Sequence, residues 1–382
     1  MRICTRCVLD ETVPAITFNN SGECEYCELH DQLDAQNPVG EQGQDWIRSM
    51  VREMRRSSRG SPYDCVIGVS GGTDSSYALH VACSSGLRPL AVHVDNGWNT
   101  ETAVRNMDKV THALGVNLRV VPADSAEFYD LQLAFLKASI PSVELPTDMA
   151  LRGYLYRAAL DVGVRHVILG TSFRTEGITP HQWGYCDGRL IRSVHRRHGT
   201  SGLRGYPNLT LSWLVYFRIL KQLQDVRILN HIDYTKEAAR ELLSREYRWV
   251  DYGGWHHEST YTKFLVSYLA PRKFGIDRRK VIWSANIRRG YLERDVALGW
   301  LRAEPLPPYP EEEATRDIEV ISRKLGVTTD ELARYIDAPP RRILDYSTYY
   351  TLIRALGPIW RAARRLGVAP ALFQGDKLPV LK

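Results

Sequence analysis

The residues with the clearest chemical signature lie between Ser70 and Ser75, in the run Ser-Gly-Gly-Thr-Asp-Ser. An apolar stretch at 64–69 precedes this run, and a helical pattern follows it. Two glycines allow a sharp turn that brings backbone N–H groups close to an anion, and the positive end of the helix adds to the attraction. The turn therefore predicts a cradle for phosphate oxygens. The alternative is a plain glycine-rich turn between a strand and a helix.

This turn differs from the two commonest nucleotide-binding loops. A P-loop requires a Gly-Lys pair, which the chain lacks, and no Gly-x-Gly-x-x-Gly pattern occurs here. Ser-Gly-Gly-x-Asp-Ser instead resembles the pyrophosphate loop (PP-loop) of the ATP pyrophosphatases, which cleave ATP between its α and β phosphates and transfer AMP to a substrate oxygen. The resemblance implies that Asp74 helps to position magnesium. It also implies pyrophosphate contacts from Ser70, Gly71, Gly72, Thr73 and Ser75.

Four of the seven cysteines form two Cys-x-x-Cys pairs near the N-terminus. They are Cys4, Cys7, Cys24 and Cys27. This spacing is typical of a four-thiolate zinc site, and a segment of about 30 residues has too little core to fold without such a staple. The alternative is a pair of disulfides, which a reducing cytoplasm disfavours. We expect a structural zinc knuckle over residues 1–30.

The amino-acid composition narrows the classes of protein to which the chain can belong. The chain has 382 residues, of which 44% are hydrophobic and 25% charged, as expected for a soluble globular protein of two or three domains. No apolar run approaches a membrane span, and the N-terminus has no apolar signal region, so we expect a cytoplasmic location. The formal net charge of +6 comes from scattered basic clusters and suits an anionic substrate. Charge alone excludes neither a nucleotide-sugar nor RNA.

Strand-like and helical segments alternate in the first half of the chain. Strands are expected at 64–69, 90–94, 118–121 and 166–169, and helices at 75–85, 101–114, 127–138 and 148–162. Continuous Val/Ile/Leu runs separated by helices predict an α/β fold with a parallel, doubly wound sheet. We expect an ATP pyrophosphatase domain at 63–205.

Other regions surround this domain. A polar connector is expected at 31–44 and a helix at 45–56, together forming a helical connector over 31–62. Residues 206–304 would continue the catalytic domain and bind substrate. A helical C-terminal region is expected at 305–382, with helices at 311–325, 329–336 and 346–366.

Ligands of a parallel sheet bind beyond the carboxyl ends of its strands, so the loops there carry the candidate residues. Asp95 and Asn96 close the second strand, where the superfamily receives adenine and ribose. Gly170 and Thr171 follow the fourth strand and are expected to contact ATP. The alternative for Asp95 is a solvated turn carboxylate.

A second carboxylate completes the expected magnesium site. Glu176 lies in the loop after the fourth strand and could join Asp74, because a cation that bridges phosphates is typically held by one or two carboxylates and waters. The alternative for Glu176 is again a solvated turn carboxylate.

A polar cluster follows a Gly-Gly turn later in the chain. It contains His256, His257, Glu258, Ser259 and Lys263. A zinc protease would need His-Glu-x-x-His, but Tyr261 stands where the second histidine belongs. We therefore expect a helix N-terminus that lines a polar pocket. The alternative is a structural histidine pair that caps a helix.

These motifs together resemble the N-acetyl sugar amidotransferase family of surface-polysaccharide biosynthesis, over nearly the whole chain. The resemblance rests on the knuckle, the Ser-Gly-Gly-x-Asp-Ser loop, the Gly-x-x-x-x-x-Glu-Gly turn and the Asp-Tyr-Gly-Gly-x-His-His-Glu-Ser cluster. The runs that begin at Asn230 and Ala338 extend it, whereas residues 146–151 lack an expected histidine. Members convert a sugar acetamido group to an acetamidino group, on activated sugars such as UDP-linked diacetamido uronic acids.

The resemblance implies a two-step reaction. Transfer of AMP to the amide oxygen gives an imidate with a good leaving group, and ammonia then displaces AMP. Loop amides, hydroxyls and magnesium would stabilise the departing pyrophosphate. His256 or His257 would move protons or hold the acetamido group. Glu258, Ser259 and Lys263 would contact the substrate.

Ammonia must be supplied to this reaction. The chain has no convincing glutaminase, because Cys4 belongs to the metal site and Cys186 lacks a nucleophile elbow. The family implies a separate glutaminase paired with a cyclase-like subunit that channels ammonia.

Two rival functions remain. A tRNA-thiolation enzyme would also combine cysteine knuckles with a pyrophosphate loop, but Cys65, Cys83 and Cys186 form no Cys-x-x-Cys pair for sulfur handling. We expect Cys65 and Cys83 to be core residues. The third possibility is a catalytically silent zinc scaffold that binds nucleotide.

Overall fold

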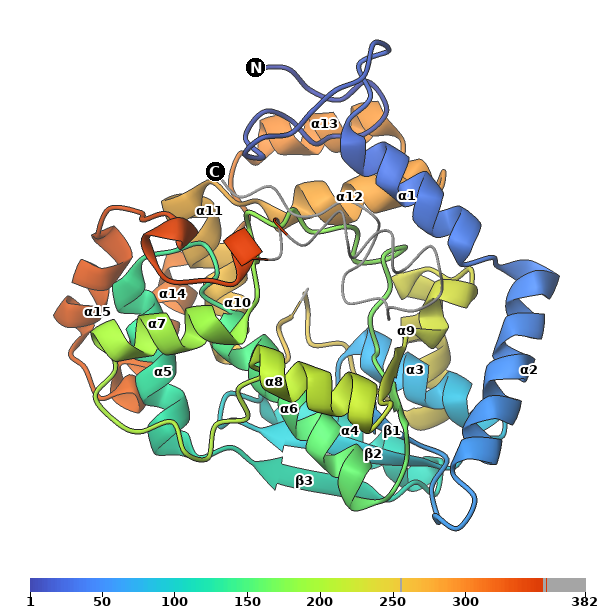
Figure 1. Cartoon of the computed structure of the whole chain (residues 1–382). Helices are drawn as coiled ribbons and strands as arrows, with labels where there is room; N and C mark the ends of the chain where they lie inside the picture. Colours follow the sequence, from blue (N-terminus) through green and yellow to red (C-terminus); the bar gives the residue numbers. More distant parts are fainter. Residues whose placement is uncertain (255, 353–354, 356–382) are drawn as a thin grey trace.

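A five-stranded parallel sheet forms the centre of the computed structural model, which describes residues 1–254, 256–352 and 355 (Figure 1). The strand order is β3-β2-β1-β4-β5, and all neighbours pair in parallel. The strands are β1 Cys65–Gly68, β2 Pro89–Asp95, β3 Leu118–Pro122, β4 His166–Ile168 and β5 Gln224–Val226. The predicted α/β fold with a parallel sheet is confirmed.

Successive side chains of β1 are buried in two different hydrophobic cores, one on each face of the sheet. Ile67 packs with residues of α2 (Gly40–Ser57), α3 (Thr73–Ser84) and α4 (Glu101–Ala113). Val66 packs on the other face, among residues of α5 (Ser125–Ala138) and α6 (Leu145–Asp161). Because both faces are covered, β1 is apolar throughout, which explains its continuous hydrophobic run in the sequence.

The remaining helices pack around this α/β unit. They are α1 Glu25–Gln36, α7 Gly188–His198, α8 Leu211–Val215, α9 Lys236–Tyr247, α10 Thr260–Lys263, α11 Ala270–Phe274, α12 Arg278–Arg288, α13 Arg294–Ala303, α14 Glu311–Leu325 and α15 Thr329–Asp337. Two π-helical segments, Tyr216–Leu220 and Phe264–Leu269, continue α8 and α10, and short 3-10 turns span Ile228–His231 and Ile343–Asp345.

The polar segment at 31–44 is largely helical, because α1 runs to Gln36 and α2 starts at Gly40, before the expected helix start at residue 45. The strand β5 was missed because Gln-Asp-Val is neither long nor apolar. The helices at 311–325 and 329–336 are confirmed as α14 and α15, whereas most of the expected helix at 346–366 lies outside the described residues.

The strand order creates a crevice at one edge of the sheet. The chain passes from β1 to β2 and β3 on one side, then returns to place β4 on the other side of β1. The loops after β1 and β4 therefore diverge at the carboxyl edge, where ligands of open α/β sheets bind. No helix in the described part of the chain is long and apolar enough to cross a membrane.

Candidate functional site

The Ser70–Ser75 loop makes a tight turn at the carboxyl end of β1. Gly71 has a φ of +76°, and a Cβ on it would lie 2.1 Å from the carbonyl oxygen of Ala103, so only glycine fits. The hydroxyls of Ser70 and Ser75 lie 3.1 Å apart and form part of the turn. Because α3 begins at Thr73, the loop leads directly into a helix N-terminus, whose positive dipole end favours an anion.

The segment before the His-His cluster packs directly on this loop. The indole N–H of Trp249 donates to the carbonyl of Gly71 at 3.0 Å, and the Thr73 N–H donates to the hydroxyl of Tyr252 at 3.2 Å. A Cβ on Gly72 would lie 3.4 Å from Glu258 Oε1. The structure therefore brings Glu258 beside the loop, from a position far away in sequence.

Asp74 is buried and held by two partners that sequence analysis did not identify. The hydroxyl of Tyr234 donates to Asp74 Oδ1 at 2.8 Å, and Lys236 Nζ lies 2.8 Å from Oδ2. Burial opposes the charge of Lys236, but Asp74 and Glu176 outweigh it and raise the pKa of this ammonium. The only sequence signal was the run that begins at Asn230, which was matched to the family without a chemical role.

Glu176 lies in the same charged cluster. Burial and the negative charge of Asp74 raise its pKa to about 7, while Lys236 and His256 act in the opposite direction. Two ionised carboxylates close together repel each other, and a divalent cation bound between them offsets this repulsion. Asp74 and Glu176 thus fit magnesium, and the loop of Glu176 lies close to α3, since a Cβ on Gly170 would be 2.6 Å from Ser75 Cα.

A buried arginine anchors the loop that carries Glu176. Arg174 is 3% exposed and forms an ion pair with Asp34 of α1. Its guanidinium also donates to the carbonyls of Asn37 at 2.6 Å and Asn230 at 3.0 Å. The position of Glu176 therefore depends on α1 and on the 3-10 turn at Ile228–His231.

The two histidines face different surroundings. His256 has a left-handed φ of +58°, and its Nδ1 lies 3.2 Å from Glu258 Oε1. Burial disfavours the charged form of His256, but its hydrogen bond and attraction to Glu258 outweigh burial. The pKa of this imidazole is therefore raised. Burial and Lys263 lower the pKa of His257. His256 therefore joins the loop cluster, and His257 packs against Gly254 instead.

The expected helix start after the histidines is confirmed. Ser259 caps α10 by accepting a hydrogen bond from the Thr262 N–H at 3.3 Å. Lys263 Nζ lies 2.6 Å from carboxylate oxygens of both Glu313 and Asp317, which ties α10 to α14. Its charge is thus neutralised within the protein.

Asp95 and Asn96 form turns at the end of β2. Asp95 is exposed and accepts from the Gly97 N–H at 2.9 Å, and Asn96 accepts from the Trp98 N–H at 3.2 Å. Thr171 is exposed after β4. These three residues lie on loops at the carboxyl edge of the sheet, but they make no hydrogen bond to the Ser70–Ser75 loop within the described ranges.

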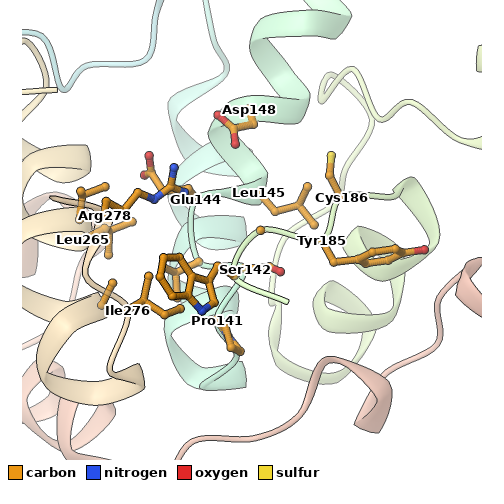
Figure 2. Close-up of a pocket in the computed structure, with 15 residues that line it drawn as sticks. Pro141, Ser142, Glu144, Leu145, Asp148, Tyr185, Cys186, Leu265, Ile276 and Arg278 are labelled. Carbon is orange, nitrogen blue, oxygen red and sulfur yellow. The ribbon is translucent and has the colours of Figure 1, made fainter. Parts of the chain in front are cut away.

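A pocket lined by charged and apolar side chains lies at the N-terminus of α6 (Figure 2). Figure 2 shows Glu144, Asp148 and Arg278 on one side of this pocket and Cys186 on the other. Burial and Asp148 raise the pKa of Glu144 to about 8, although Arg278 and His256 oppose the shift. Cys186 is exposed to solvent at this position.

The four N-terminal cysteines converge as expected for a metal knuckle. Their Sγ atoms all lie within 4.8 Å of one another and are buried. Neighbouring Sγ atoms are 3.7–3.8 Å apart, which matches the edge of about 3.8 Å expected for tetrahedral zinc with bonds of about 2.3 Å. Arg288 donates to the Sγ atoms of Cys7 and Cys27 at 3.3 Å, which suits thiolates. The donor set fits zinc.

The knuckle also packs on the loop that carries Glu176. Its cysteines share a core with Phe173, Ile178 and Trp183, which flank Glu176 in sequence. Helix α1, which starts within the knuckle, packs against α12 at the top of Figure 1. A metal-dependent fold of residues 1–30 therefore reaches the loop after β4 through direct packing.

The fold and this site define an α/β protein with a pyrophosphate-type loop at the carboxyl edge of a parallel sheet. Residues 258–359 match the family model described as "LPS biosynthesis protein WbpG-like, C-terminal domain". This match covers the C-terminal part of the chain and agrees with the resemblance to proteins of surface-polysaccharide biosynthesis.

Other comparisons are weaker. An NH3-dependent NAD synthetase from Campylobacter jejuni is 12% identical, with 83% of this chain and 98% of that chain covered and a TM-score of 0.30. An NMN synthetase from Francisella tularensis is 16% identical, with 61% and 95% covered and a TM-score of 0.28. These values are too low to support an argument about function. No curated protein matches the chain.

Proposed function

We propose that this chain is an ATP-dependent amidotransferase acting on an N-acetylated nucleotide-sugar. It adenylates the acetamido oxygen and replaces that oxygen with ammonia, which gives an acetamidino sugar, AMP and pyrophosphate. The observation that carries the proposal is the Ser70–Ser75 loop beside the buried Asp74 and Glu176, in a chain with a WbpG-like C-terminal domain.

In the first step the loop receives the β and γ phosphates of ATP. The N–H groups at the start of α3 and the hydroxyls of Ser70 and Ser75 bind the departing pyrophosphate. Magnesium held by Asp74 and Glu176 would neutralise charge on this leaving group. Asp95 and Asn96 face adenine and ribose, and Gly170 and Thr171 complete the ATP site.

The acceptor lies on the side of the loop lined by the histidine cluster. Its acetamido oxygen attacks the α-phosphorus, and ammonia then attacks the imidate carbon and expels AMP. His256, paired with Glu258, accepts the proton that the nitrogen loses. Glu258 Oε2 is buried without a hydrogen-bond partner among the described residues, so it is available to the acceptor.

The other three residues of the cluster make structural contacts. Ser259 caps α10, Lys263 is paired with α14, and His257 packs on a glycine turn. We assign these residues to the wall of the acceptor site. Ammonia comes from a separate glutaminase with a cyclase-like subunit, as the family resemblance implies.

Thiolation of tRNA is the second candidate, and the cysteines disfavour it. Burial raises the pKa of Cys83 to about 11. A thiol that carries sulfur needs the opposite shift, because the thiolate is the nucleophile.

The test is a reaction of the purified chain with ATP, magnesium, ammonium and a panel of N-acetylated nucleotide-sugars. We expect AMP and pyrophosphate only when acceptor and ammonium are both present, with a product lighter by the difference between oxygen and NH. AMP formation that depends on tRNA would support the second candidate. Cleavage of ATP at its terminal phosphate would contradict both.

A further inference from the structure

Two arginines at the carboxyl edge of the sheet have no protein partner. Arg227 directly follows β5, and its Nε is buried with no hydrogen-bond partner among the described residues. Arg152 lies on α6 and makes no hydrogen bond or ion pair within the described ranges. Burying guanidinium N–H groups without an acceptor costs free energy. An anion bound by the two side chains would supply the acceptors.

The backbone directs both side chains to the same place. Asp225 in β5 accepts from the hydroxyl of Tyr156 on α6 at 2.9 Å. Residues two apart on a strand point to the same face, so Arg227 also faces α6. Arg152 precedes Tyr156 by one helical turn, on the same side of that helix.

Arg152 also lies beyond the end of the sheet. Leu155 of α6 contacts Gly68, the last residue of β1, since a Cβ on that glycine would be 3.0 Å from Leu155 Cδ1. The helix runs opposite to the strands, because it leads into β4, which is parallel to β1. Three residues earlier, Arg152 therefore lies about 4.5 Å further out, at the level of the Ser70–Ser75 loop.

Nearby carboxylates of the described residues attract Arg152 without forming an ion pair with it: burial lowers the pKa of this guanidinium, but Asp225 and Asp148 outweigh burial and raise it. Asp225 already binds Arg218 Nη2 at 2.7 Å and the Tyr156 hydroxyl. Asp148, one turn before Arg152 on α6, forms no ion pair within the part of the chain that the structure describes. Burial and the positive charge of Arg152 lower the pKa of Arg227, as expected for like charges that face each other.

We propose that Arg152 and Arg227 form an oxyanion subsite for a carboxylate or phosphate group of the acceptor. This inference rests on the proposed function for the identity of the acceptor. Two guanidinium forks match the geometry of such a group, and each contributes paired N–H donors. Arg227 follows β5, and Arg152 lies over the end of β1, so the subsite is next to the Ser70–Ser75 loop, on the side of β4 and β5.

Binding of nucleotide-sugars to the full chain tests this subsite. The probes are UDP-N-acetylglucosaminuronate and UDP-N-acetylglucosamine, and the variants are Arg152→Met and Arg227→Met. Each variant is expected to raise the Kd by about tenfold or more, the effect of a lost charged hydrogen bond. If only the uronate probe loses affinity, the group bound by the subsite is the carboxylate of the sugar. If both probes lose affinity equally, the bound group is a phosphate. The control is Arg157→Met, an exposed position on the same helix.

The outcomes separate the subsite from the proposed function. Unchanged Kd values for both probes would overturn the subsite, as would an equal loss of ATP affinity. If the wild type binds neither probe, the proposed class of acceptor is wrong. The subsite is then tested with sulfate as the anion. Sulfate should raise the Tm of the wild type in a saturable manner and that of the double variant much less. An equal rise would overturn the subsite.

A stability measurement excludes a merely structural role. Because neither arginine forms a hydrogen bond or ion pair through its side chain with the described residues, the methionine variants should melt close to the wild-type temperature in the absence of ligand. A marked drop would mean that these side chains support the fold instead.

Discussion

Lys236 Nζ lies 2.8 Å from Asp74 Oδ2, which joins the start of α9 to the first turn of α3 across the pyrophosphate loop. Asp74 and Glu176 raise the pKa of this ammonium, although burial lowers it. A lysine therefore pairs with the carboxylate to which we assign magnesium, and this carboxylate is the group that can be tested most directly.

Asp74→Asn should lower AMP formation by about 100-fold or more, because the carboxamide keeps the shape of the side chain but loses the charge that a divalent cation needs. The measurement is pyrophosphate release at saturating ATP. The control is Asp161→Asn, an exposed position at the end of α6. Unchanged release in Asp74→Asn would revive the silent nucleotide-binding scaffold.

The protonation of Glu144 should make stability depend on pH. Its pKa rises from 4.5 to about 8 because of burial and Asp148, so the folded chain keeps a proton that the unfolded chain releases. The free energy of unfolding contributed by this group is complete below about pH 4.5 and is lost as pH rises towards about 8. The slope stays below about 1.4 kcal/mol per pH unit, since Glu144 is only half-buried.

Glu144→Gln should remove this part of the pH dependence. Denaturant unfolding at several pH values measures it, with Glu41→Gln in the exposed part of α2 as the control. Parallel curves for Glu144→Gln and the wild type would show that this carboxyl ionises normally in the fold.

Removal of the knuckle metal should disturb the active site as well as the N-terminus. We expect about one zinc per chain, and Cys7→Ser should lower both zinc content and Tm, the latter by about 10 °C. AMP formation should fall too, because the knuckle packs on the residues that flank Glu176. Elemental analysis and melting curves report these effects. Cys83→Ser, outside the knuckle, should keep its zinc.

Arg174→Met should weaken both stability and activity. The substitution leaves the carbonyls of Asn37 and Asn230 without their charged donor and should cost about 2–4 kcal/mol. Glu176, two residues away, would lose its fixed position, so AMP formation should fall further than the folded fraction does. Arg192→Met on the exposed face of α7 serves as the control. Activity proportional to folded protein would mean that Glu176 is positioned independently.

The strands and loops that carry the first half of the site were predictable because their signals are local. The apolar run before Ser70, the glycines of the loop and the Cys-x-x-Cys pairs each define a structure within a few residues. The strand β5 carries no such signal, since Gln-Asp-Val pairs with β4 only because the rest of the sheet offers an edge. Arg227 was overlooked for the same reason.

The sequence by itself determined the parallel sheet, the anion-binding turn at Ser70–Ser75 and the four-thiolate knuckle, because hydrophobic periodicity, glycine conformations and thiolate spacing act over short stretches of chain. Only the tertiary structure decided that Tyr234, Lys236 and Glu258 meet Asp74 and the pyrophosphate loop, and that Lys263 is occupied by α14. These contacts join segments more than a hundred residues apart or separate helices, and the packing that closes such distances leaves no local pattern in the sequence.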